Sequence, residues 1–285
     1  MSRVTILGSE GQIGAYLSEY LEKKGHEVTG IDVVYGPEND LRVTPNSYVE
    51  SKIKDADFVF FLAFDVGGSR YLKKYQHTFE FNNNNTRMMA NTFRLLNKYK
   101  TPFVFASSQM SNMSYSPYGV MKRVGELHTT ALKGLIVKFW NVYGIEKDME
   151  KAHVITDFIR RGFEEGEFEM LTDGTEERQF LYAEDCCEGL ETVMECYSDF
   201  KSTDPLHITS FHETSIKDIA AHIQGQFNLI GMDNVRINPG IAKDSVQLDK
   251  RNSADTYITG WWRPTTGIDA GIAKVFEQMK EEYNV

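Results

Sequence analysis

The sequence is short of cysteine and of basic residues. Its three cysteines, Cys186, Cys187 and Cys196, are too few and too irregularly spaced for a disulfide framework or a zinc site, so we expect buried or idle thiols in a reducing compartment. Because 31 Lys and Arg stand against 41 Asp and Glu, the formal charge is -10, and the chain lacks the cationic field that sequence-independent phosphate binding requires. We therefore expect no nucleic-acid partner, and any anionic ligand must be held by local groups.

Long hydrophobic runs are also missing. The longest, residues 58–64 (FVFFLAF), is far shorter than the roughly 20 apolar residues of a membrane-spanning helix. Residues 1–8 lead directly into a strand pattern and lack the basic, apolar and cleavage segments of a secretory signal. The seven histidines show no metal-ligand spacing. We therefore expect a cytoplasmic protein with no membrane association and no bound metal.

Short β-favouring segments alternate with helical ones over the first 145 residues. Strands are predicted at 4–7, 27–32, 58–64, 103–106 and 135–139, with helices after the first strand, near 86–99 and at 117–132. This alternation is typical of an α/β protein with a doubly wound parallel sheet. After residue 144 the strands shorten, and helices are predicted at 215–227, with a capping-box-like start at Ser215 and Asp218, and at 268–283. We infer a second, smaller region that contacts a substrate.

One low-complexity patch, NNNN at 82–85, precedes the helix predicted near 86–99. Asparagine is a poor helix former. The patch is therefore either a polar turn at the start of that helix or a set of amides that face a ligand, and the sequence favours neither.

Three glycines follow the first predicted strand. Gly8, Gly11 and Gly14 permit a tight turn, the approach of a pyrophosphate to main-chain N–H groups, and its contact with a helix N-terminus. Asp32 lies 18 residues after Gly14 at the end of the second strand, where a carboxylate accepts hydrogen bonds from a ribose diol. The first part of the chain is therefore predicted to be a Rossmann-type dinucleotide-binding domain.

Acidic residues near this loop favour NAD as the cofactor. Asp32, with Glu10 in the loop and no Arg beside it, would repel the 2′-phosphate of NADP. Asp40, followed by Leu41, supplies another carboxylate. It either contacts the adenine amino group or is a solvated loop acid, and spacing alone supports both interpretations equally.

The motif YGVMK at 118–122 follows a Ser-Pro helix start, so Tyr118 and Lys122 fall at positions i and i+4 on one helical face. A nearby ammonium favours the tyrosinate and lowers the Tyr118 pKa from its usual value near 10. Removal of a proton from a sugar hydroxyl near neutral pH requires such a base. A Tyr-x-x-x-Lys pair alone is common and mostly without a catalytic role, but beside a dinucleotide-binding loop it predicts one.

With these residues the chain resembles the extended short-chain dehydrogenases/reductases, and within them the NAD-dependent nucleotide-sugar epimerases and dehydratases. The resemblance covers nearly the whole chain. It rests on GSEGQIG (8–14), Asp32, Asp40-Leu41, LAF (62–64), DVGG (65–68), the Asn-rich stretch, FVFASS (103–108), SPYGVMK (116–122), NVYG (141–144), ERQFLYAED (177–185) and GWWRP (260–264).

The resemblance implies roles for single residues. Tyr118 would be the catalytic base, Lys122 would bind the nicotinamide ribose and lower the Tyr118 pKa, and Ser108 would hydrogen-bond the reacting hydroxyl. With the glycine loop, the expected cofactor contacts are Gly8, Gly11, Gln12, Ile13, Gly14, Asp32, Asp40, Leu41, Leu62, Ala63 and Lys122. The expected substrate contacts are Asn141, Arg178, Gly67 and Ser107.

Asn141 and Arg178 would hold the substrate's nucleotide and pyrophosphate, and the planar guanidinium fork of Arg178 suits a phosphate. The alternative for Arg178 is a surface ion pair with Glu176 or Glu177. The resemblance also implies an NAD-binding Rossmann domain over 1–145 with a return segment at about 178–200, and a mainly substrate-binding region over 146–285. It further implies a homodimer formed through the Asn-rich helix and the Tyr118 helix.

Departures from the family pattern narrow the predicted reaction. Ser108 lies only ten residues before Tyr118, so Ser107 or Ser111 are alternatives for its role. Gln109 stands where the 4,6-dehydratases place an acid, and Met110 stands near the position of the Cys of the 3,5-epimerising branch. Both departures disfavour those activities and leave simple oxidation at C4.

The predicted function is NAD-dependent oxidation at C4 of a GDP- or UDP-linked sugar, by a 4-epimerase or by a 4-dehydrogenase that releases the 4-keto sugar. Alternatives are a nucleotide-sugar 4,6-dehydratase or 4-keto reductase, and a reductase or alcohol dehydrogenase for a small metabolite. A non-catalytic NAD-binding sensor or assembly subunit is an alternative of another class, although it would not need the Tyr118 and Lys122 pair.

Overall fold

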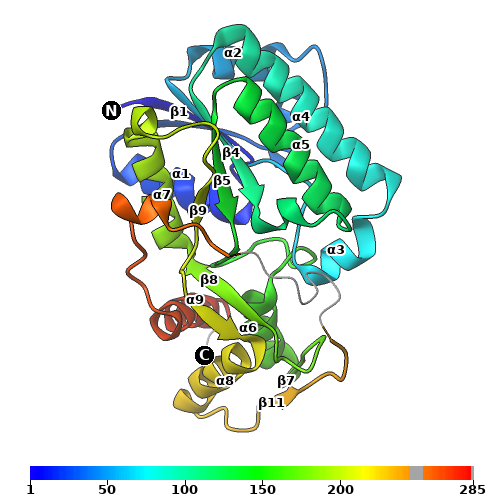
Figure 1. Ribbon diagram of the computed structural model, residues 1–285. Helices are drawn as coiled ribbons and strands as arrows, with labels where there is room; N and C mark the ends of the chain where they lie inside the picture. Colours follow the sequence, from blue (N-terminus) through cyan, green and yellow to red (C-terminus); the bar gives the residue numbers. More distant parts are fainter. Residues whose placement is uncertain (244–252, 284–285) are drawn as a thin grey trace.

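A six-stranded parallel sheet forms the upper part of the molecule in Figure 1. The computed structural model describes residues 1–243 and 253–283. The strands run in the order β2 (Glu27–Ile31), β1 (Arg3–Leu7), β3 (Phe58–Phe61), β4 (Phe103–Ser108), β5 (Leu135–Phe139) and β9 (Leu206–Ile208). Every neighbouring pair is parallel. The predicted α/β class with a doubly wound parallel sheet is confirmed.

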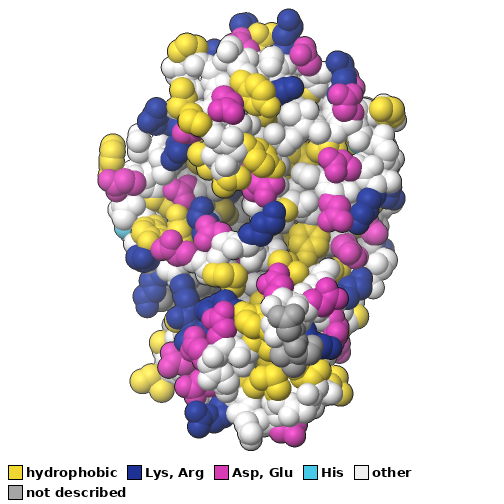
Figure 2. Space-filling model, turned by 180° about the vertical axis from the view of Figure 1, so that it is seen from behind, with side chains coloured by type: hydrophobic (Ala, Val, Ile, Leu, Met, Phe, Trp, Pro, Cys, Tyr) yellow, Lys and Arg dark blue, Asp and Glu magenta, His cyan; other side chains and the backbone are white. Residues whose placement is uncertain are grey.

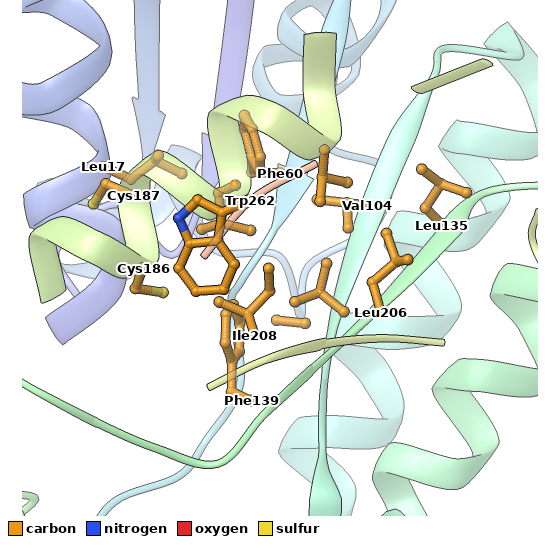
Figure 3. Packing of buried hydrophobic residues seen from close by; sticks show 14 of the residues in the cluster. Leu17, Phe60, Val104, Leu135, Phe139, Cys186, Cys187, Leu206, Ile208 and Trp262 are labelled. Carbon is orange, nitrogen blue, oxygen red and sulfur yellow. The ribbon is translucent and has the colours of Figure 1, made fainter. Parts of the chain in front are cut away.

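Helices cover both faces of this sheet (Figure 1). Helices α1 (Gln12–Lys23) and α7 (Ala183–Glu195) pack together on one face, and α2 (Ser47–Asp55), α4 (Phe79–Tyr99) and α5 (Pro117–Ala131) pack on the other. Because strand side chains alternate between faces, Val104 belongs to the α1–α7 core and its neighbour Phe105 to the other core. Figure 3 shows the first core, in which Trp262 lies against Cys186 and Ile208.

The lower part of the molecule has its own hydrophobic core. Helices α6 (Val154–Glu165), α8 (Ile216–Leu229) and α9 (Ile268–Glu282) enclose it, with the pair β7 (Glu167–Glu169) and β11 (Arg236–Asn238). A three-stranded sheet of β10 (Glu213–Ser215), β8 (Glu177–Tyr182) and β6 (Asn141–Tyr143) lies between the two parts. On β8, Leu181 packs into the upper core and Phe180 and Tyr182 into the lower one.

The chain returns to the upper part after β8. Helix α7 packs on α1, β9 extends the large sheet beyond β5, and Trp262 fills the core between them. This contact pattern supports our proposal of a Rossmann-type domain over 1–145 with a return near 178–200, although β9 lies just beyond that return segment. The N-cap predicted at Ser215 is present, because its hydroxyl accepts a hydrogen bond from the Asp218 N–H at 3.2 Å.

The interpretation of residues 82–85 as a turn was wrong, because they lie inside α4, which begins at Phe79. The helix starts earlier because Thr78 caps it, accepting a hydrogen bond from the Phe81 N–H at 3.2 Å. The buried Asn85 amide donates to the Phe81 carbonyl at 3.0 Å and accepts from the Asp65 N–H at 2.8 Å. Tertiary hydrogen bonds thus outweigh the low helix propensity of asparagine.

The surface carries charges of both signs, and Figure 2 shows basic and acidic side chains side by side over one face. Within residues 1–243 and 253–283, no helix has both the length and the apolar character that a membrane crossing demands.

Candidate active site

A cavity of about 1270 Å³ lies at the carboxyl ends of the strands, where ligands of doubly wound sheets bind. It draws its lining from both parts of the molecule. All eleven predicted cofactor contacts line it: Gly8, Gly11, Gln12, Ile13, Gly14, Asp32, Asp40, Leu41, Leu62, Ala63 and Lys122. Ser107, Ser108, Tyr118 and Gly67 line it too, whereas Asn141 and Arg178 do not.

The glycine loop cannot accept side chains at its first and third glycines. Gly8 has φ +89°, and a Cβ there would lie 2.7 Å from the Ala63 backbone. A Cβ on Gly14 would lie 2.0 Å from the Gly8 carbonyl oxygen. Gly11 caps α1 without a side-chain hydrogen bond. The positive end of α1 is therefore open toward the cavity, as a pyrophosphate requires.

The Asp32 carboxylate is fixed at the end of β2 by two backbone donors. One oxygen accepts from the Glu10 N–H at 3.0 Å and the other from the Val34 N–H at 3.3 Å. A carboxylate has about four lone-pair sites, so capacity remains for the hydroxyls of a ribose. The free acceptor sites of Asp32 therefore fit the ribose hydroxyls of NAD.

The Asp40 carboxylate is engaged by Arg42, a residue that no sequence motif singled out. Arg42 donates from Nε to Oδ1 and from Nη2 to Oδ2, both at 2.9 Å, and the hydrogen bond from Arg42 holds the pKa of Asp40 below its ordinary value. Asp40 is therefore a paired carboxylate at the cavity wall, and its contact with adenine stays a prediction. Arg42 also contacts Asn84 at 3.3 Å, and Asn84 lines the cavity, which favours the ligand-facing interpretation of the asparagines.

Tyr118 and Ser108 meet inside the cavity. Ser116 caps α5 by accepting from the Gly119 N–H at 3.1 Å, and Gly119 allows the helix start to approach the Met110 carbonyl, which a Cβ would meet at 2.2 Å. Ser108 and Tyr118 both line the cavity at this point. Burial raises the pKa of Tyr118 to about 12, and the Ser108 hydroxyl nearby opposes that rise.

Lys122 lies beside this pair, buried at 3% exposure. Its Nζ donates to the Ala106 carbonyl at 2.6 Å and lies 3.7 Å from the centre of the Phe64 ring and 5.8 Å from that of Tyr118. Burial lowers the Lys122 pKa from 10.5 to about 7, and the Glu126 charge opposes that fall. The predicted lowering of the Tyr118 pKa by Lys122 is not found: burial raises the Tyr118 pKa and lowers the Lys122 pKa, so it disfavours the charged form of each group.

Ser107 lines the cavity, and its predicted contact with the substrate stays a prediction, although its hydroxyl has another partner. Successive side chains of a strand point to opposite faces, so Ser107 points away from Ser108. Its hydroxyl donates to the buried Glu126 carboxylate at 2.6 Å. Ser111 is buried and does not line the cavity, so the geometry selects Ser108 among the three serines.

The other predicted substrate contacts differ in their placement. Gly67 lines the cavity and allows a close approach of Lys151, whose Cα a Cβ would meet at 2.9 Å. The Asn141 Oδ1 is buried without a hydrogen-bond partner among the described residues. Arg178 is buried at 7% exposure and donates to the Glu177 carbonyl at 2.6 Å, so it does not lie at the surface as the ion-pair alternative assumed.

Sequence reasoning missed the pair of Glu146 and His153, which lines the cavity. His153 Nδ1 lies 2.7 Å from Oε1 of the buried Glu146; burial lowers the His153 pKa, but the Glu146 charge and hydrogen bond outweigh it and leave the pKa raised. Trp140 also lines the cavity, and it donates to His207 Nδ1 at 3.2 Å. These residues lie outside the motifs, so only a scan for titratable side chains near NVYG would have found them. Across the described ranges, no cluster suited to a metal ion occurs.

Comparison with known proteins places this geometry among related folds. A model of the NAD dependent epimerase/dehydratase family matches residues 4–208. The UDP-N-acetyl-alpha-D-glucosaminuronate decarboxylase of Bacillus cytotoxicus is 28% identical over 257 residues, which cover 78% of this chain and 79% of that protein.

Solved structures share the whole fold. Epimerase Mth375 of Methanothermobacter thermautotrophicus superposes with a TM-score of 0.84 at 18% identity, covering 99% of this chain and 93% of that one. The NAD-dependent NDP-hexosamine 5,6-dehydratase TunA superposes with a TM-score of 0.80 at 19% identity, covering 99% and 98%.

Proposed function

The chain belongs to the NAD-dependent epimerase/dehydratase family, and from this premise we propose that it oxidises the C4 hydroxyl of a nucleoside-diphosphate sugar. The observation that carries the proposal is that Ser108, Tyr118 and Lys122 line the same cavity as the glycine loop and Asp32. A cavity of about 1270 Å³ has room for a dinucleotide and a sugar nucleotide together. A UDP or GDP sugar is the proposed substrate.

NAD, when bound by the glycine loop and Asp32, supplies the hydride acceptor. We assign the proton to Tyr118 in its tyrosinate form: the phenolate oxygen accepts the proton of the C4 hydroxyl and becomes the neutral phenol, while Ser108 holds the C4 hydroxyl in place. Lys122 assists when it is charged, because an ammonium beside the phenol favours the tyrosinate. With a Lys122 pKa of about 7, we expect its assistance to fade as the pH rises through neutrality.

Two outcomes of this oxidation are proposed. If the 4-keto sugar takes the hydride back on its other face, the enzyme is a 4-epimerase; if it leaves, the enzyme is a 4-dehydrogenase. Asn141 and Arg178 stay our proposal for the nucleotide and pyrophosphate of the substrate. Because neither lines the cavity, this assignment requires the segments that carry them to move toward it.

A second candidate is a dehydratase-type reaction, and the Glu146–His153 pair favours it. A C4 ketone makes the neighbouring C5 proton acidic, and loss of a hydroxyl from C6 then needs a proton donor. The raised pKa of His153 suits a donor. Gln109 stands where the 4,6-dehydratases place an acid, but it is buried and does not line the cavity. His153 would therefore be the proton donor in its place. The names of the decarboxylase and dehydratase relatives agree with chemistry beyond C4.

One assay separates these possibilities. Purified protein is incubated with NAD and a panel of UDP and GDP sugars, and the products are identified by mass and chromatography. An isomer indicates a 4-epimerase, loss of two hydrogens a 4-dehydrogenase, and loss of water a dehydratase. Tyr118→Phe, which keeps the ring, should form none of these products. If wild type turns over no sugar yet binds NAD, the sensor alternative replaces the proposal.

We also propose a homodimer through α4 and α5. Three apolar side chains, Val120, Val124 and Leu127, repeat along the exposed face of α5 at 43%, 37% and 57% exposure. Beside them a mainly apolar hollow of about 540 Å³ lies between the two helices, lined by Met89, Phe93 and Leu132 among others. A second copy of this face would cover the stripe. Light scattering after size exclusion tests the proposal.

A further inference from the structure

A buried carboxylate lies behind the Tyr118 and Lys122 pair. Glu126 follows Lys122 by one turn of α5 and is 1% exposed. A charge this deeply buried is stable only when hydrogen bonds and opposite charges surround it. Ser107 donates to its Oε1 at 2.6 Å, Lys138 Nζ lies 3.3 Å from the same oxygen, and Arg123 Nη1 lies 2.8 Å from Oε2. None of the reaction steps proposed above uses this group.

These contacts join three elements beneath the site. Ser107 and Lys138 are register partners on β4 and β5, and Glu126 reaches both from α5. Lys138 is buried at 5% exposure, whereas the Arg123 side chain is 55% exposed. The contacts of Glu126 with Ser107 and Lys138 are therefore buried inside the fold, whereas its contact with Arg123 lies at the protein surface.

Ser107 is the neighbour of Ser108, so whatever fixes Ser107 also fixes the serine that meets Tyr118. We propose that Glu126 is a positioning residue for the oxidation proposed above: it locks the end of β4 so that Ser108 stays on Tyr118, and its charge supports the Lys122 ammonium. The inference rests on the proposed function for its catalytic consequence. Its structural and electrostatic consequences can be measured without any substrate.

The electrostatic part follows from the groups around Lys122. On its own helix these are Tyr118 and Glu126; β4 contributes the Ala106 carbonyl, and β5 contributes Lys138 on the far side of Glu126. Burial lowers the Lys122 pKa and Glu126 opposes the fall. Replacing Glu126 by neutral Gln removes that opposition and leaves the positive Lys138 nearby, so Lys122 should lose its proton at lower pH.

The test compares Glu126→Gln with Arg123→Gln, which removes only the exposed partner of the same carboxylate. The first readout is the titration midpoint of the Lys122 side chain by NMR with labelled lysine, assigned through Lys122→Met. We expect Glu126→Gln to lower this midpoint by about one pH unit, and Arg123→Gln to leave it unchanged. The second readout is turnover: Glu126→Gln should lower kcat about 10- to 100-fold with an unchanged KM for the sugar.

An unchanged Lys122 midpoint and kcat in folded Glu126→Gln would overturn the proposal. If this variant does not fold, because Lys138 is then buried without its carboxylate, Ser107→Ala takes its place. That variant keeps the charge, so we expect a lower kcat with the wild-type midpoint, and a wild-type kcat would count against the positioning role. If wild type turns over no sugar, the proposed function has failed, while the midpoint still decides the electrostatic part.

Discussion

The buried ammonium of Lys122 should lower the free energy of unfolding of the protein. Burial moves its pKa from 10.5 to about 7 at 3% exposure. A difference of about 3.5 units corresponds to about 5 kcal/mol at 1.36 kcal/mol per unit. The hydrogen bond to the Ala106 carbonyl and the contact with the Phe64 ring return about 2 kcal/mol. Lys122→Met, which keeps an unbranched side chain of similar length, should therefore be about 3 kcal/mol more stable than wild type at pH 6.

The sign of the pH dependence follows from the lowered pKa. Below about pH 7 the ammonium is charged in both the folded and the unfolded chain, and the full cost is present. Between about pH 7 and pH 10.5 the unfolded chain binds the proton more strongly, so wild type gains stability as the pH rises. About 2 kcal/mol of the cost is left near pH 9, so the variant's advantage should be close to zero there.

Urea unfolding of nucleotide-free protein at pH 6, 7, 8 and 9 measures both effects. Equal slopes for the two proteins would show that the free energies of unfolding can be compared directly. If wild type and Lys122→Met unfold at the same urea concentration at pH 6, or if their difference stays constant up to pH 9, burial of the ammonium does not carry the expected cost in stability. We expect Lys122→Met to lose turnover whichever of these stability results is obtained.

Four further perturbations test other parts of the molecule. Tyr118→Phe should lower kcat about 10²- to 10⁴-fold while NAD affinity, measured by calorimetry, stays within about twofold. Gly14→Ala should abolish NAD binding in the same assay, since its Cβ would lie 2.0 Å from the Gly8 carbonyl. Asn85→Ala should lower the free energy of unfolding by about 1–3 kcal/mol, measured in urea, because it leaves the Asp65 N–H without its acceptor. Val124→Glu should convert a dimer into a monomer in light scattering, and an unchanged mass would refute the α4–α5 interface.

Local patterns were enough to predict which residues lie together at the glycine-loop end of the cavity. A strand, three spaced glycines, a helix and a carboxylate at the end of the next strand form a continuous piece of chain, so their mutual placement follows from backbone geometry. All of the predicted cofactor contacts line one cavity. The pair Tyr118 and Lys122 was equally predictable, because the helix period fixes residues four positions apart on one face.

Local patterns did not predict the hydrogen-bond partners of several side chains. Residues 82–85 are helical rather than a turn, and the Asn85 side chain accepts a hydrogen bond from the Asp65 N–H, 20 residues away. The Ser107 hydroxyl donates to Glu126, 19 residues away on α5. Asp40 accepts hydrogen bonds from Arg42, a contact that spacing alone did not suggest.

The α/β fold class, the glycine loop and the Tyr-Lys pair could be predicted from the sequence, since each depends on residues close together in the chain. Packing in three dimensions was needed to show which serine lies beside Tyr118, how strongly Lys122 is desolvated, and that Glu146, His153 and Glu126 lie near the same groups. Burial and long-range approach set pKa values and hydrogen-bond partners, and these depend on which segments pack together in space.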